Sequence, residues 1–430
     1  MRSFDIRSPK FALRSSYVFF TVSIVMVLYN YRLGGTRDFG LYVNAGHAFI
    51  NGENAYETQL WRSGSFGSTV MWLTSLPIPS SLEPHIFQLL SFAGFFIFAN
   101  LLGIASEKRF WIYGIILFLS PVREVINTIQ ITGFVIGLIA ISLIAQGPKS
   151  KLTPFTYTFL QGTAMAIALD LKPHSIMFVI VLLFVKKMKR EVVFWAFGIC
   201  FIGHAVINVI NKNILEVSWV HNLMNLGNAS GENGESTSIW RLVDHLSEGK
   251  ANTSVISLLL IVFLLLIVGF FGEKFSLRDL VLIGLILSSF MTYMHYYDLA
   301  PLSVCILVLL SKNSKSILGL STLMFMILPR EVGTVRNVLI LLLLTSLISL
   351  FIQMKNDRVR DSLIAIGLAM STFIGLHLVN YLLALEYRLG HALVTTQTMI
   401  LILSFIISKS KLTQGLEWTA RNRFGKEKGL

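Results

Sequence analysis

The chain has 430 residues, of which 54% are hydrophobic, 12% are aromatic and only 14% are charged. With a mean hydropathy of +0.69, this composition is typical of a membrane protein with many spans and excludes an ordinary soluble domain. The net charge of +13 could indicate a nucleic-acid partner, but the basic residues are scattered between apolar runs. We therefore expect no nucleic-acid binding.

Apolar runs bounded by charged residues follow one another along the chain and predict transmembrane helices. They lie at residues 17–31, 85–105, 110–122, 131–145, 155–169, 175–185, 192–210, 255–271, 280–294, 299–310, 317–328, 338–352, 363–385 and 392–407. The pattern predicts an all-α polytopic membrane protein with roughly 14 spans (12–14). We expect the whole chain, residues 1–430, to form a single integral-membrane domain.

The distribution of basic residues predicts the orientation of these spans. If both termini are cytoplasmic, 25 of the 36 Lys and Arg residues lie on the inner side, including those of the basic tail 409–430, as expected for a plasma-membrane protein. The two longest polar segments, 32–84 and 211–253, then lie outside, and we expect short helices in the first. No small-residue cleavage site follows Tyr31, so the first span is expected to remain as an anchor.

Two ionisable residues at predicted outer helix ends are the first candidates for chemistry. Asp38 follows the first span directly, where a carboxylate could act as a base. Lys172 lies in a turn of a few residues between two spans, which places its charge at the membrane boundary. It could bind a phosphate, or it could extend to lipid headgroups or pair with Asp170.

Further candidates lie in later outer segments. His295 and Asp298 flank two tyrosines at the end of one predicted span. An aromatic belt at the membrane interface would explain Tyr297 but not the two titratable residues. Arg241 lies in the second long outer loop, where a local salt bridge or a headgroup contact is the alternative to a role in a site.

No pattern in the sequence indicates a metal or a cofactor. The outer segments contain no clustered Asp-x-Asp and no pair of histidines at a metal-ligand spacing. The two cysteines, Cys200 and Cys305, lie inside apolar runs, and no Gly-rich phosphate loop follows a strand. We expect a protein that works without a metal or a cofactor.

Taken in order, these features resemble glycosyltransferase family 87, a group of GT-C type membrane mannosyltransferases that use polyprenol-phosphate-mannose. The resemblance is carried by Asp38-Phe39, Tyr42, Ala45, Gly52, Tyr56, Gln130, Leu171-Lys172-Pro173 and Tyr296-Tyr297-Asp298. The chain departs from the family pattern at Ala55, where Pro is frequent, and at Ile129, where Gly commonly precedes the Gln. Residues from about Ser311 onward carry little of the resemblance.

The resemblance implies an outward-facing transferase that moves a sugar, most often mannose, from a polyprenyl-phosphate donor to a lipid or glycan acceptor, with inversion and without a metal. It implies that Asp38 is the base and that Lys172, His295 and Arg241 bind the donor phosphate. The protein is expected to be surrounded by membrane lipids. Weaker substrate contacts are expected from Tyr42, Tyr56, Gln130, Tyr297 and Asp298.

Two other functions fit parts of the pattern. A lipid-linked oligosaccharide flippase or another transporter would carry ionisable residues at mid-membrane, whereas the predicted spans are nearly free of charge at their centres, with His204 and His377 the chief exceptions. An O-antigen-type polymerase would share the polyprenyl substrate but would have large outer loops with paired arginines. The candidates at the outer helix ends favour the transferase.

Overall fold

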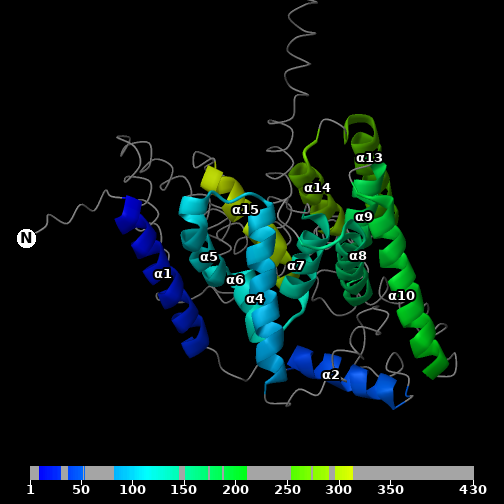
Figure 1. Ribbon diagram of the computed structural model, residues 1–430, viewed down its shortest axis with the longest axis horizontal. Helices are drawn as coiled ribbons and strands as arrows, with labels where there is room; N and C mark the ends of the chain where they lie inside the picture. Colours follow the sequence, from blue (N-terminus) through cyan, green and yellow to red (C-terminus); the bar gives the residue numbers. More distant parts are fainter. Residues whose placement is uncertain are drawn as a thin grey trace, which may run out of the picture.

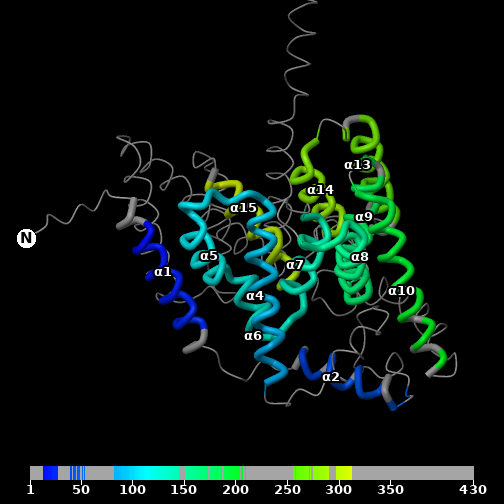
Figure 2. Tube along the Cα trace, in the orientation of Figure 1, coloured from blue at the N-terminus to red at the C-terminus, as the bar shows by residue number. Residues whose placement is uncertain are grey.

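The computed structural model describes residues 9–30, 37–51, 53, 82–144, 151–172, 175–185, 188–210, 253–272, 275–289 and 296–312. All regular elements in these ranges are helices, which confirms the predicted all-α class (Figures 1 and 2). They are α1 (Pro9–Asn30), α2 (Arg37–Ile50), α4 (Glu83–Leu101), η2 (Ser106–Lys108), α5 (Arg109–Phe118), α6 (Ser120–Asn127), α7 (Thr132–Leu143), α8 (Pro154–Leu171), α9 (Ile176–Phe184), α10 (Arg190–Ile210), α13 (Thr253–Phe271), α14 (Leu277–Ser289), η5 (Tyr296–Leu299) and α15 (Ala300–Lys312).

Only part of the predicted membrane topology can be compared with these helices. Among the described residues, α4 is long and apolar enough to cross a bilayer, and Ser106–Phe118 together with α6 would make a second, bent span. Each predicted span up to residue 310 overlaps a helix, except that span 110–122 covers parts of two, and several of these helices are short. The number of spans therefore stays a prediction, and the four predicted spans after residue 312 lie outside the described residues.

The predicted span 110–122 is not one straight helix. The chain is extended at Leu119, with φ −63° and ψ 124°, and the axes on either side differ by 67°. Pro121 in the first turn of α6 explains the break, because it has no N–H to continue the hydrogen-bond ladder of α5. The bend turns α6 away from α5, toward η5.

Helices α4 and α7 pack at backbone contact through small residues. A Cβ atom on Gly94 would overlap the carbonyl oxygen of Gly133, and one on Gly133 would lie 2.6 Å from the carbonyl oxygen of Ser91. A Cβ on Gly137 would in turn overlap the backbone of Gly94. Small residues allow helices in membranes to approach this closely, and the contact fixes the first turn of α7 against α4.

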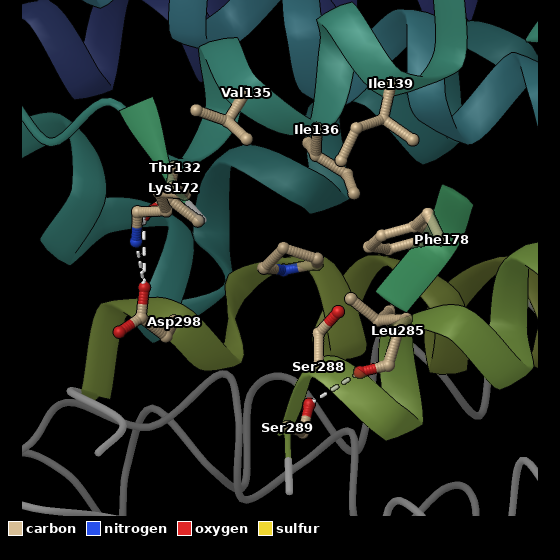
Figure 3. A pocket seen from close by; sticks show the side chains of 11 residues that line it. Thr132, Val135, Ile136, Ile139, Lys172, Phe178, Leu285, Ser288, Ser289 and Asp298 are labelled. Carbon is tan, nitrogen blue, oxygen red and sulfur yellow. Dashed lines mark hydrogen bonds and ion pairs between the residues drawn. The ribbon is translucent and has the colours of Figure 1, made fainter. Parts of the chain in front are cut away.

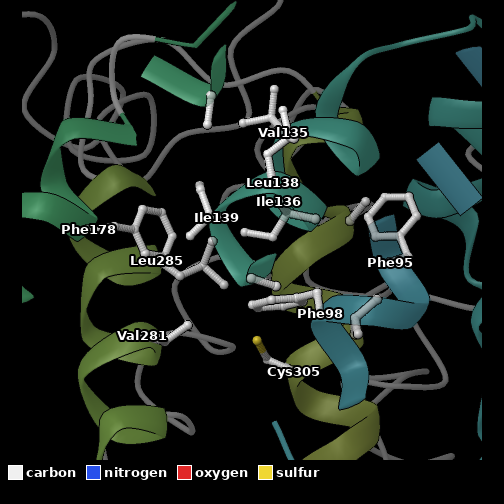
Figure 4. Close-up of a cluster of buried hydrophobic side chains, with 14 of the residues drawn as sticks. Phe95, Phe98, Val135, Ile136, Leu138, Ile139, Phe178, Val281, Leu285 and Cys305 are labelled. Carbon is white, nitrogen blue, oxygen red and sulfur yellow. The ribbon is translucent and has the colours of Figure 1, made fainter. Parts of the chain in front are cut away.

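The core lies where α4 and α7 meet α9, α14 and α15 (Figure 4). Phe95 and Phe98 are fully buried there. In contrast, the helices at the periphery expose large apolar side chains, among them Val18 of α1, Phe201 of α10 and Phe270 of α13. Exposed apolar surfaces of this kind on outer helices are typical of contact with lipid.

Helix α2 lies across one end of this bundle, transverse to α4 (Figure 1). Phe39 is buried and packs on Phe87 in the first turns of α4, with 5.4 Å between the ring centroids. This helix falls within segment 32–84, where the sequence predicted short helices. It brings position 38, in its first turn, to the end of the bundle where α4 begins.

Candidate functional site

Lys172, Asp298 and Thr132 come from three distant parts of the chain and meet at one point (Figure 3). The Lys172 ammonium forms an ion pair with Asp298 Oδ1 and donates a hydrogen bond of 2.9 Å to Thr132 Oγ1. Thr132 Oγ1 lies 3.3 Å from the same Asp298 oxygen, to which it donates. The side chains of Lys172 and Asp298 are only 12% and 14% exposed, so water screens this charge pair much less than a surface pair.

Local sequence explains where each of the three residues lies. Lys172 caps α8 in an extended conformation, with its N–H bonded to the Ala168 carbonyl at 3.0 Å, and the following Pro173 prevents the helix from continuing. Thr132 is the first residue of α7. Asp298 lies in η5, the single turn that leads into α15.

Tyr297 contributes its ring to the same cluster. The Lys172 ammonium lies 5.5 Å from the centroid of that ring, which is within the range of a cation–π interaction. The cation is thus held by a carboxylate, a hydroxyl and an aromatic face at once. The structure therefore places Lys172 in a polar cluster with Asp298, Thr132 and Tyr297, and not in an extended position toward lipid headgroups.

A cavity of about 40 Å³ opens beside the ion pair. Lys172, Asp298 and Thr132 line one side of it, and Ser288 and Ser289 of α14 line it next to Leu285 (Figure 3). The other lining side chains are apolar and are those of Val135, Ile136, Ile139, Phe178, Leu285 and Pro301. The cavity therefore combines a charge pair with apolar side chains, in a space that has room for a few water molecules.

A second polar cluster ties α2 to the segment just before α7. The Tyr42 hydroxyl donates a hydrogen bond of 3.0 Å to Gln130 Oε1. The Ser91 hydroxyl donates a hydrogen bond of 2.9 Å to the Gln130 carbonyl oxygen. Gln130 is 4% exposed, and it lies two residues before Thr132. The two clusters are therefore joined through one short stretch of backbone.

The structure brings together five of the residues predicted from the sequence, in two linked clusters built on two pairs. Lys172 lies with Asp298, and Tyr42 lies with Gln130. Tyr297 joins the first pair. Position 38 is in the first turn of α2, but the Asp38 side chain lies outside what the structure describes, as do Tyr56, Arg241 and His295. Their predicted roles stay predictions.

Sequence reasoning missed Thr132, Ser91 and the serine pair at the end of α14. Thr132 carried a weak signal, because it is a polar residue two positions after Gln130 at the start of an apolar run. Serines in apolar helices usually bond to their own backbone, and Ser288 and Ser289 do so, at 2.9 Å and 2.8 Å. Nothing in the sequence distinguishes them from other such serines.

The described residues contain no group of three or more His, Cys, Asp or Glu side chains that could hold a metal ion. The two cysteines are buried and free, at separate places in α10 and α15. The described part of the site therefore offers one cation, one carboxylate and several hydroxyls. Such a set can bind and orient an anion by charge and hydrogen bonds.

Comparison with known proteins gives one family. The sequence matches the model described as glycosyltransferase family 87 over residues 69–294, a little more than half of the chain. The matched range includes Gln130, Lys172 and Arg241; it begins after α2 and ends one residue before His295. No curated protein and no solved structure matches the chain.

Proposed function

This chain belongs to glycosyltransferase family 87, and from that membership we propose that it transfers a sugar from a polyprenyl-phosphate donor to a lipid or glycan acceptor. The family indicates a membrane glycosyltransferase. This favours an enzyme over the flippase that also fitted parts of the sequence pattern. The proposal adds the donor class, mannose as the sugar and the outer membrane face as the place of reaction. Mannose rests on the family resemblance alone.

The observation that supports a lipid phosphate donor is the cavity beside Lys172. Lys172 and Thr132 offer a cation and a hydroxyl to a phosphate, and the neighbouring apolar side chains of α7, α9 and α14 offer contact to a hydrocarbon chain, for which this small cavity would have to widen. This combination of a cation with apolar side chains supports a prenyl monophosphate as the donor.

Lys172 would be the principal cation for the donor phosphate. Its ammonium is now compensated by Asp298, and a bound phosphate would take over part of that interaction. Negative charge grows on the phosphate as the bond to the sugar breaks, so a cation held in place by Thr132 stabilises the transition state more than the ground state. We assign His295 and Arg241 as further phosphate ligands on the basis of the resemblance.

Asp38 is the proposed base. It would accept the proton of the acceptor hydroxyl while that oxygen attacks the anomeric carbon, and the bond from this carbon to the phosphate oxygen would break at the same time. The products are the glycosylated acceptor and polyprenyl phosphate. Attack opposite to the leaving group inverts the anomeric configuration.

The first experiment compares purified wild type with Asp38→Asn for transfer of radiolabelled mannose from polyprenyl-phosphate-mannose to membrane lipid acceptors. Loss of a general base should lower the rate by about 10²- to 10⁴-fold, while the nearly isosteric variant should fold as wild type does. An Asp38→Asn protein that fails to accumulate would make Asp38 structural. Absence of transfer by either protein, over a panel of polyprenyl-phosphate sugars, would refute the proposed function and make lipid translocation the next assay.

Lys172→Ala tests the donor site, and Lys151→Ala is its matched control because Lys151 is an exposed lysine just before the other end of α8. Lys172→Ala should raise the KM for the donor far more than the KM for the acceptor. Lys151→Ala should change neither. Unchanged donor dependence in Lys172→Ala would remove this lysine from the site.

The proposed reaction uses fixed cations in place of a metal. A monophosphate leaving group needs less counter-charge than a nucleotide diphosphate, so Lys172 with His295 and Arg241 should suffice. The test is transfer activity after treatment with a chelator. Activity that is abolished by the chelator and restored by a divalent ion would contradict this part of the proposal.

A further inference from the structure

The segment Thr128–Thr132 joins α6 to α7, and we call it the α6–α7 junction. We propose that this junction is a positioning element for the reaction and that Gln130 is its positioning residue, which orients α2 through Tyr42. The inference rests on the proposed function, because the purpose of orienting α2 is to place position 38 relative to Lys172.

The junction has a defined and unusual backbone. The Gln130 N–H bonds to the Val125 carbonyl at 2.8 Å, and the Ile129 N–H bonds to the Ile126 carbonyl at 3.3 Å. These two bonds form a Schellman motif at the end of α6. Ile129 has φ of 53°, a left-handed conformation that Gly normally adopts and that is costly for a β-branched residue.

Tertiary contacts hold this costly conformation in place. Ile129 is 1% exposed, so its side chain gains the free energy of burial in the core. Gln88 of α4 donates a hydrogen bond of 2.9 Å to the Ile126 carbonyl, and Ser91 does the same for the Gln130 carbonyl. Strained backbone that is retained by surrounding contacts occurs frequently at functional sites.

The junction connects four elements through three of its groups. The Gln130 side chain accepts from Tyr42 of α2, the Gln130 carbonyl accepts from Ser91 of α4, and the Thr132 hydroxyl contacts both Lys172 and Asp298. Position 38 lies one helical turn before Tyr42 in α2, so fixing Tyr42 limits rotation of α2 about its axis. Because Gln130 holds Tyr42 and Thr132 holds Lys172, the backbone between these two residues fixes how position 38 lies relative to Lys172.

A kinetic comparison tests this role. Gln130→Met keeps the side-chain length but removes the acceptor, and Tyr42→Phe removes the donor. Each should lower kcat by about 5- to 10-fold, the scale of one hydrogen bond, with little change in the donor KM. The double variant should be no slower than either single variant, because both changes break the same contact.

The matched controls lie at the other end of α7. Gln161→Met and Tyr157→Phe remove the same side-chain groups, which there donate to backbone carbonyls near Ile144. Both controls should keep the wild-type kcat. A donor or acceptor KM that rises in Gln130→Met alone would show a direct substrate contact and overturn the inference, and so would equal losses of kcat in the controls.

A distance measurement makes the inference independent of turnover. Spin labels at Asn44 of α2 and Ala93 of α4, both exposed, report how these helices lie relative to each other, and the two native cysteines are buried. Gln130→Met and Tyr42→Phe should broaden or shift the distance distribution, and Gln130→Glu, which keeps an acceptor for Tyr42, should restore it. If an active enzyme shows the same distribution in all variants, the inference fails and the proposed function stands. If wild type transfers no sugar, the proposed function fails, and the distances still show whether Gln130 orients α2.

Discussion

The two ends of α7 are both held by a Gln and a Tyr, but in different ways. At its start, Gln130 and Tyr42 bond to each other across 88 residues of sequence, and Thr132 contacts Lys172 and Asp298. At its end, Gln161 donates to the Ser142 and Ile144 carbonyls, and Tyr157 donates to Ile144 as well. The residues bonded to each other at the end of α7 are only 13 to 19 positions apart in the sequence.

This difference distinguishes the candidate site at the start of α7 from the hydrogen bonds that only cap its last turn. The carbonyls at the end of any helix need donors, and the next helix in the chain supplies them at Ile144. At the start of α7, Tyr42 of α2 bonds to Gln130, and Lys172 at the end of α8 bonds to Asp298 of η5 and to Thr132. A buried charge pair is costly to desolvate, which makes this end of α7 the candidate for function. We therefore expect variants at the start of α7 to affect activity and variants at its end to affect stability.

Gly94→Ala should have the largest effect. The new methyl group would overlap the carbonyl oxygen of Gly133, so α4 and α7 must separate, at a cost of about 1–3 kcal/mol. Because Gln130 and Thr132 lie next to this contact, activity should fall further than the loss of stability explains. Thermal unfolding and sugar transfer, measured on the same preparation, test this.

Gly198→Ala is the control for that substitution, because a Cβ on Gly198 of α10 meets no atom within 4 Å. It should leave activity unchanged and raise the melting temperature slightly, since Ala favours helix by about 1 kcal/mol over Gly. Equal melting temperatures and activities for Gly94→Ala and wild type would show that the close contact of α4 with α7 does not position the site.

Thr132→Val should have the next largest effect. It keeps the shape of the side chain but removes the hydroxyl that contacts Lys172 and Asp298. A hydrogen bond to a charged group contributes about 1.5–3 kcal/mol, so we expect roughly a 10-fold or larger rise in the donor KM. Thr132→Ser should restore most of the affinity. A donor KM that is the same in all three proteins would exclude the hydroxyl from the site.

Gln161→Met should act on stability alone. Its amide donates to two carbonyls at 2.9 Å, and the side chain is 8% exposed. Leaving these carbonyls without that donor should lower the free energy of unfolding by about 1–3 kcal/mol, with kcat and KM as in wild type. A melting curve measures the stability, and a transfer assay measures kcat and KM. Loss of activity without loss of stability would contradict the proposal that the end of α7 has only a structural role.

Tyr157→Phe should have the smallest effect. The Tyr157 hydroxyl donates at 2.7 Å to the Ile144 carbonyl, which also accepts from Gln161. Because the carbonyl keeps that second donor, the loss should be about 1 kcal/mol or less. The melting temperature measures it. A destabilisation larger than that of Gln161→Met would assign the main contact at this end to the tyrosine.

Much of the local structure could be predicted from the sequence. Apolar runs bounded by charges predicted the long apolar helices up to residue 310, because hydrophobic length and charge are properties of short segments. The break at Leu119 was missed, although Pro121 was a local sign of it. The left-handed Ile129 could not be found, since an isoleucine adopts that conformation only where surrounding contacts hold it.

The sequence by itself determined that this chain forms apolar helices and that Lys172, Gln130 and Asp298 are polar residues at their ends. Only the tertiary structure decided their partners. Lys172 could have paired with Asp170, two positions away, but its ammonium contacts Asp298, 126 residues further along the chain. The physical reason is that a charge at a helix end binds the opposite charge that packing brings close. Here the contact of α4 with α7 and the position of η5 against α6 determine which charge that is.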